Sequence, residues 1–241
     1  MTNFPSLIVF GPLNTCLSAQ ELRELRNSLL SYEQLDCVKE AVSGLPDLWK
    51  TLLENDAGLE PVYGLAAAEQ LAAWVSTGDT PCNSVTWNSA LGFSLTIVSH
   101  LCDYLTYLRE TSYAHPSILN RVIKNGGVLG FCAGLLSAIA VANSIDDESI
   151  GLHGALSVRL AFSIGVYVDL DSIRHGPASC LAVRWKPPDS ISTVENLLNK
   201  HDTVSKCNTP ALFGAFVPSV CAEPYHPFTV VEYQTSASEK A

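Results

Sequence analysis

The feature that most constrains the fold of this chain is a glycine-rich segment at residues 126–134, which reads GGVLGFCAG. A short apolar run at 128–130 has the composition of a buried strand, and the apolar stretch 135–143 is long enough for a helix. Gly130 and Gly134 bracket the turn between them, where the missing Cβ lets the backbone pack closely. Strand, sharp turn and helix are the parts of a nucleophile elbow, G-x-nucleophile-x-G. The segment therefore predicts an α/β fold with Cys132 at the turn.

Cys132 is the candidate nucleophile of this turn. Its side chain is expected at the start of the helix, where free N–H groups and the helix dipole stabilise negative charge. The backbone N–H of Ala133 is then one predicted oxyanion donor. A buried structural cysteine in a glycine-rich turn is the alternative interpretation, and the pentapeptide alone leaves both open.

A cysteine nucleophile needs a base, and a histidine usually provides it. His115 precedes a proline and His175 precedes Gly-Pro, so both are expected in loops. His100 lies on an apolar helix predicted at 90–108, and His226 lies in a proline-bounded loop. These last two histidines are the candidate catalytic bases.

The rest of the chain predicts short strands and amphipathic helices. Ser18 and Glu21 have the spacing of a capping box, which marks the start of a helix. After residue 203 the apolar pattern loses its period. Strands are expected at 6–10 and 179–185, and helices from 45 to 53, 66 to 75, 150 to 169 and 192 to 200.

Charge and cysteine usage exclude several classes of function. The formal net charge is −10, whereas proteins that bind nucleic acid or anionic membranes are usually basic. The apolar stretch 128–142 is shorter than the about 20 residues of a membrane span. The eight cysteines show no CxxC spacing, so no metal site is expected. We therefore expect a cytoplasmic protein with reduced thiols, without nucleic-acid or membrane partners.

Five segments in order resemble the starter-unit acyl-carrier-protein transacylase (SAT) domain at the N-terminus of fungal non-reducing polyketide synthases. The resemblance runs from about residue 6 to about residue 200, and the turn around Cys132 is its most specific element. The segments are LIVFG at 7–11, SGLPDL at 43–48, LTIVSHLCDYL at 95–105, GFCAG at 130–134 and IGVYVD at 164–169.

The resemblance implies an α/β-hydrolase-like acyltransferase core at 1–175 and part of a ferredoxin-like subdomain at 176–202. Residues 203–241 are then an irregular C-terminal tail. Such domains move an acyl group from acyl-CoA onto the cysteine, here Cys132, and then onto the phosphopantetheine thiol of an acyl carrier protein. The implied partners are that carrier protein or a polyketide synthase, and no bound cofactor is implied.

The sequence departs from the family pattern at three places. Leu13 stands where the family has a glutamine whose backbone N–H contributes to the oxyanion hole, and His100 replaces a glutamine of the long helix. The family's catalytic histidine follows the ferredoxin-like subdomain, but here the pattern stops near residue 200, so the chain is expected to be C-terminally truncated. His226 is the candidate substitute. Three hypotheses follow: an active acyltransferase, a truncated non-catalytic accessory or remnant, and a cysteine hydrolase of acyl thioesters.

Overall fold

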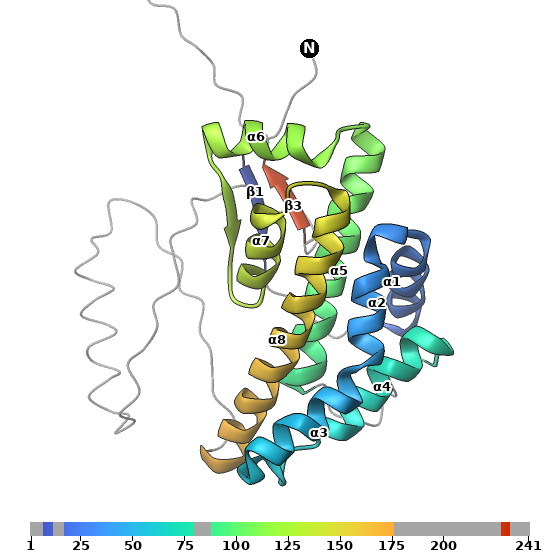
Figure 1. Cartoon of the computed structure of the whole chain (residues 1–241), viewed down its shortest axis with the longest axis vertical. Helices are drawn as coiled ribbons and strands as arrows, with labels where there is room; N and C mark the ends of the chain where they lie inside the picture. Colours follow the sequence, from blue (N-terminus) through green and yellow to red (C-terminus); the bar gives the residue numbers. More distant parts are fainter. Residues whose placement is uncertain (1–6, 12–16, 80–87, 176–227, 232–241) are drawn as a thin grey trace, which may run out of the picture. The chain divides into compact units, whose positions relative to one another are not determined.

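The computed structural model describes residues 7–11, 17–79, 88–175 and 228–231. The chain divides into two compact units, and every described residue belongs to the unit formed by 1–176 and 219–241. This unit is mostly helical with a small sheet (Figure 1). Its elements are β1 (Leu7–Phe10), α1 (Ala19–Ser31), η1 (Glu33–Leu35), α2 (Asp36–Ser43), α3 (Leu45–Asn55), η2 (Ala57–Leu59), α4 (Gly64–Ser76), α5 (Ser89–Thr111), α6 (His115–Asn125), β2 (Val128–Gly130), α7 (Gly134–Asn143), α8 (Asp147–His175) and β3 (Phe228–Val231).

The three strands have the order β2-β1-β3. β1 is parallel to β2, with Phe10 opposite Gly130, and antiparallel to β3, with Phe10 opposite Phe228. Helices α6 and α7 pack beside the sheet, and α5 runs along α8 (Figure 1). The predicted α/β class is confirmed. β3 was not predicted, and the strand and helix expected at 179–185 and 192–200 lie outside the described residues.

Local sequence signals place several helices correctly. Ser18 Oγ accepts a hydrogen bond from the Glu21 N–H at 3.2 Å, and a Glu21 carboxylate oxygen accepts from the Ser18 N–H at 2.6 Å. The predicted capping box at the start of α1 is therefore confirmed. On the same helix, Leu22 and Leu29 are buried, and the Leu22 carbonyl accepts from the Trp74 indole of α4 at 3.1 Å.

The long helix α8 meets α5 at a close crossing. A Cβ added to Gly165 would lie 2.5 Å from the backbone N and Cα of Ala90, so only glycine fits there. One turn later, the Asp169 carboxylate accepts from the Ser89 N–H at 2.8 Å and the Ala90 N–H at 3.2 Å. Asp169 thus caps α5 from a neighbouring helix. The segment IGVYVD therefore has a structural role at this crossing.

Replacing Asp169 with alanine is expected to lower the free energy of unfolding by about 2 kcal/mol, because it leaves two N–H groups of α5 without their acceptor. Asp169→Asn retains one oxygen acceptor and is expected to lose about half as much. Urea unfolding followed by circular dichroism measures both variants. Equal stability of wild type and Asp169→Ala would contradict this account of the cap.

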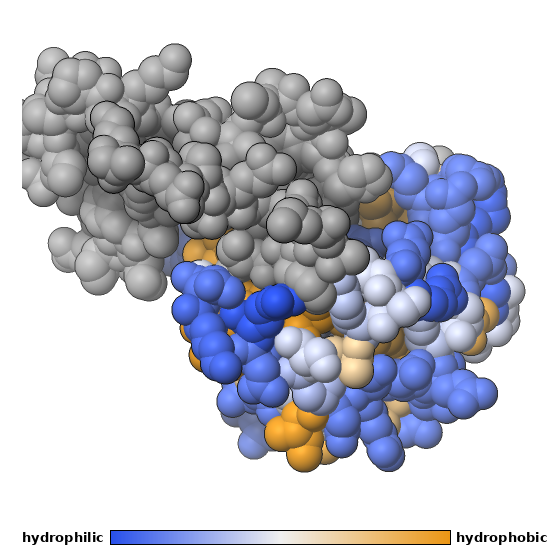
Figure 2. Space-filling model, turned by 90° about the horizontal axis from the view of Figure 1, so that it is seen from above, coloured by the Kyte–Doolittle hydropathy of each residue, from blue (hydrophilic) through white to orange (hydrophobic). Residues whose placement is uncertain are grey.

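α8 is also long and apolar enough, by length and composition alone, to cross a membrane. However, 56% of its most apolar 18-residue segment is buried inside the protein, as in a core helix. A row of half-exposed apolar side chains, including Leu152, Leu156 and Leu160, remains on its outer face. On the face shown in Figure 2, most of the described surface is hydrophilic, with a few separate apolar patches.

Candidate active site

Cys132 lies in the turn between β2 and α7, and its side chain is exposed. Its backbone has φ of +56°, in the left-handed region that residues with a side chain rarely adopt. Such strain persists only where the surrounding structure enforces it. Here the Phe131 N–H donates to the Phe10 carbonyl at 2.9 Å, and the Leu135 N–H donates to the Cys132 carbonyl at 3.0 Å. The turn is therefore fixed on both sides of the thiol.

The glycines that flank Cys132 have no room for a side chain. A Cβ on Gly134 would lie 2.3 Å from the Phe10 carbonyl oxygen, and one on Gly130 would lie 2.3 Å from the Leu135 Cα. Both distances are far below van der Waals contact, so each glycine allows one close backbone approach. The strand, sharp turn and helix predicted from the sequence are confirmed.

The surroundings of the thiol combine a free backbone donor with apolar side chains. Ala133 is the N-cap of α7, and no described residue accepts a hydrogen bond from its N–H. Phe131 and Leu135, on either side of the turn, are 38% and 52% exposed. Leu13, the other predicted oxyanion position, lies outside the described residues. The arrangement suits a nucleophile that attacks a carbonyl group, forms a tetrahedral oxyanion and takes up an apolar group.

His100 contacts the buried face of α7, the helix that follows the Cys132 turn and is called the elbow helix below. It belongs to α5, is completely buried, and its Nδ1 lies 2.9 Å from the Ser137 Oγ of α7. Its ring packs against Phe10 with a centroid distance of 5.3 Å. The structure thus brings His100 to the helix that Cys132 precedes, whereas His226 lies outside the described residues. Ser137 was missed by sequence reasoning, and its one signal was a serine within an otherwise apolar stretch.

The prediction that His115 and His175 lie in loops is wrong. His115 is the first residue of α6 and is fully buried, because the following Pro116 fits the first helical turn, where no intrahelical N–H bond is needed. His175 is the last residue of α8, and its Nδ1 lies 2.8 Å from an Asp171 carboxylate oxygen.

The side chain of His115 joins three elements through both ring nitrogens. Nε2 lies 3.0 Å from the Ser144 carbonyl, which can only accept, so Nε2 carries the hydrogen. The Tyr104 hydroxyl then donates to Nδ1 at 2.7 Å. Burial lowers the pKa of His115 and raises the pKa of Tyr104. The pair is thus held neutral where α5, α6 and the end of α7 meet.

This network predicts a loss of stability in acid. Because the pKa of His115 is lowered from its ordinary 6.5, the unfolded chain takes up the proton first as the pH falls. The contribution of His115 to the free energy of unfolding is therefore fully present above pH 6.5. Below that pH the free energy of unfolding decreases, by up to about 1.4 kcal/mol per pH unit. His115→Gln is expected to be less stable near neutral pH but to lose less on acidification. Urea unfolding at about pH 7.5 and about pH 5.5 measures both slopes, and parallel slopes would contradict the prediction.

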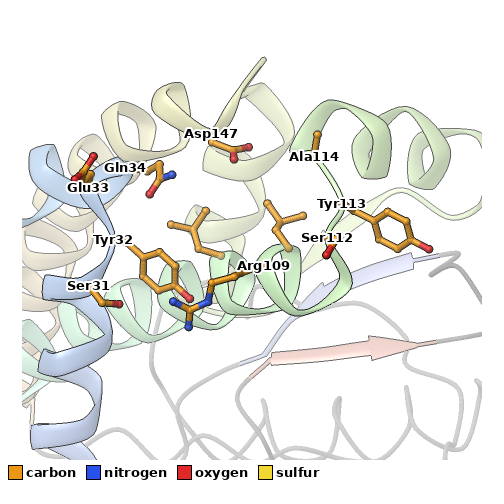
Figure 3. Close-up of a pocket in the computed structure, with 11 residues that line it drawn as sticks. Ser31, Tyr32, Glu33, Gln34, Arg109, Ser112, Tyr113, Ala114 and Asp147 are labelled. Carbon is orange, nitrogen blue, oxygen red and sulfur yellow. The ribbon is translucent and has the colours of Figure 1, made fainter.

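Other polar features of the described residues do not compete with Cys132. Burial raises the pKa of the Cys102 thiol to about 12, so this thiol stays protonated. Within the described ranges, no group of three or more His, Cys, Asp or Glu side chains could hold a metal ion. A hollow of about 490 Å³ lies where Tyr32 and Arg109 face Asp147 (Figure 3), and its lining includes neither Cys132 nor His100.

Comparison with known proteins assigns the chain to a family. Residues 65–208 match the family described as "Starter unit:ACP transacylase in aflatoxin biosynthesis". The chain is 40% identical over 202 residues to methylphloroacetophenone synthase from Cladonia uncialis, and 32% identical over 203 residues to 5-methylorsellinic acid synthase from Aspergillus terreus. Each match covers 82% of this chain. It is also 32% identical over 230 residues, 88% of the chain, to non-reducing polyketide synthase pkbA from Emericella nidulans.

The chain spans 8–9% of the length of these relatives. The family match nevertheless covers more than half of the 241 residues and includes the elbow around Cys132. The chain therefore belongs to the starter unit:ACP transacylase family, whose relatives here are fungal polyketide synthases.

Proposed function

We propose that this chain loads acyl starter units in polyketide biosynthesis, by moving an acyl group from acyl-CoA through Cys132 to an acyl carrier protein. The observation that carries the proposal is the strained, exposed Cys132 between two glycines that cannot bear a side chain. Strain of this kind is typical of a nucleophile presented at a turn. Membership of the transacylase family supports the same reaction.

The proposed reaction has two balanced steps. The Cys132 thiol gives its proton to a histidine base, its sulfur bonds to the thioester carbonyl, and the carbon–sulfur bond to coenzyme A breaks. The departing coenzyme A thiolate takes the proton back. In the second step, the phosphopantetheine thiol of the carrier protein gives its proton to the base and its sulfur bonds to the acyl carbonyl. The carbon–sulfur bond to Cys132 breaks, and the Cys132 thiolate takes the proton. The Ala133 N–H, with a backbone donor near Leu13, stabilises both oxyanions.

His100 and His226 are the two candidate bases, and the proposed reaction implies a core of the α/β-hydrolase-like acyltransferase type. Coenzyme A and phosphopantetheine enter as substrates, so the reaction needs no bound cofactor or metal. The half-exposed Phe131 and Leu135 beside the thiol favour an uncharged, apolar acyl group. We place the reaction in the cytoplasm, with a carrier protein or polyketide synthase as partner.

The proposal is tested by supplying the protein with short- and medium-chain acyl-CoAs and a carrier protein that bears phosphopantetheine. The expected result is one acylated carrier for each coenzyme A released, and no acylation of a carrier without phosphopantetheine. Mass spectrometry of the carrier and a thiol assay of coenzyme A measure both products. Because Cys132 is exposed, water is the competing acceptor. Coenzyme A release at the same rate without carrier would show a thioester hydrolase instead, and no release at all would favour a non-catalytic accessory.

A further inference from the structure

We infer that His100 and Ser137 form a buried pair that positions the elbow, and that His100 does not act as the proton acceptor. The inference rests on the proposed function, because it divides the roles of the two candidate histidines. Both side chains of the pair are completely buried, and they join α5 to α7 through the 2.9 Å contact of Nδ1 with Oγ. The pair therefore holds the elbow helix from its core side.

The elbow helix has an outer and an inner face. Leu135 and Ile139 are 52% and 49% exposed on the outer face, and the exposed Cys132 thiol precedes that helix. Ser137 and Ala138 face the core, and the His100 Nδ1 contacts α7 at Ser137, on that side. A general base must come within hydrogen-bond distance of the exposed thiol. The observed orientation directs His100 to the serine hydroxyl on the inner face.

Phe10 connects the pair to the turn itself. Its carbonyl accepts from the Phe131 N–H at 2.9 Å and abuts Gly134, while its ring packs against the His100 ring. The His100 ring therefore packs against Phe10, whose carbonyl holds the turn. Ser137 in turn fixes the orientation of the His100 ring. Loss of either side chain is expected to move Cys132 relative to its oxyanion donors, and small displacements of this kind lower rates strongly.

The test compares His100→Gln, His100→Leu and Ser137→Ala with a matched control, Ser163→Ala. The Gln amide can still hydrogen-bond Ser137 but cannot titrate, whereas Leu removes the contact. The Ser163 hydroxyl donates only to Arg159 within its own helix, at 2.9 Å. Two readouts are used: kcat and KM for acyl transfer, and the pH profile of Cys132 alkylation by iodoacetamide, followed on the Cys132 peptide by mass spectrometry.

A positioning role predicts that His100→Leu and Ser137→Ala lower kcat by about tenfold with little change in KM. His100→Gln is expected to lose clearly less than His100→Leu, and the control Ser163→Ala is expected to stay near wild type. The pH midpoint of Cys132 alkylation is expected to be the same in His100→Gln and wild type. A shifted midpoint, or equal loss of kcat in the Gln and Leu variants, would overturn the inference. Absence of acyl transfer by the wild type would refute the proposed function alone, because alkylation still reports whether His100 controls the thiol.

Discussion

Cys132→Ala is expected to lower the rate of acyl transfer by more than about 1,000-fold, because it removes the nucleophile of the covalent step. Alanine has no nucleophilic atom in its side chain, so nothing replaces the lost sulfur. Release of coenzyme A from acyl-CoA, measured at saturating substrate, reports the loss. The fold is expected to remain, since the exposed thiol makes no described packing contact with the core.

The matched control is Cys37→Ser, which changes another exposed cysteine, on α2. This variant is expected to keep the wild-type rate, because α2 packs mainly on α8 and α4 rather than on the elbow. A Cys132→Ala protein that keeps more than about a tenth of the wild-type rate would contradict nucleophilic catalysis by this residue.

Gly134→Val is expected to lower both stability and activity. Its Cβ would lie 2.3 Å from the Phe10 carbonyl oxygen and 2.8 Å from the Gly11 carbonyl oxygen, and backbone atoms cannot move away as a side-chain end can. We expect a loss of about 3 kcal/mol in the free energy of unfolding. The displaced α7 would also carry Cys132 away from the end of β1, so acyl transfer should be lost even where the protein stays folded.

Gly92→Ala is the control for this change, because a Cβ at Gly92 of α5 meets nothing within 4 Å. Alanine in a helix is more stable than glycine by up to about 1 kcal/mol, so this variant should unfold at the same or higher urea concentration. Thermal and urea unfolding followed by circular dichroism compare the two variants. Similar effects of Gly134→Val and Gly92→Ala would show that the elbow tolerates a side chain.

Features determined by neighbouring residues were predictable from the sequence. The elbow follows from two glycines four residues apart around Cys132. The start of α1 follows from the reciprocal bonds of Ser18 and Glu21, which are three residues apart. In both cases the local chemistry alone selects the backbone conformation.

Features that depend on packing between distant segments were not predictable. Ser137 meets His100 only after α5 and α7 pack together, and His115 becomes buried only when Tyr104 and Ser144 close around it. β3 is a four-residue strand without a clear period, so its pairing with β1 gave no signal in the sequence. The capping of α5 is a further example, because Asp169 is separated from Ser89 by 80 positions in the chain and from Ala90 by 79.

The central claim, that Cys132 carries the acyl group, is tested most directly by intact-protein mass spectrometry after incubation with a panel of acyl-CoAs. The account predicts that the wild type gains the mass of one acyl group, that peptide mapping places it on Cys132, and that a carrier protein with phosphopantetheine removes it. A protein that stays unmodified and releases no coenzyme A with any member of the panel would contradict the account.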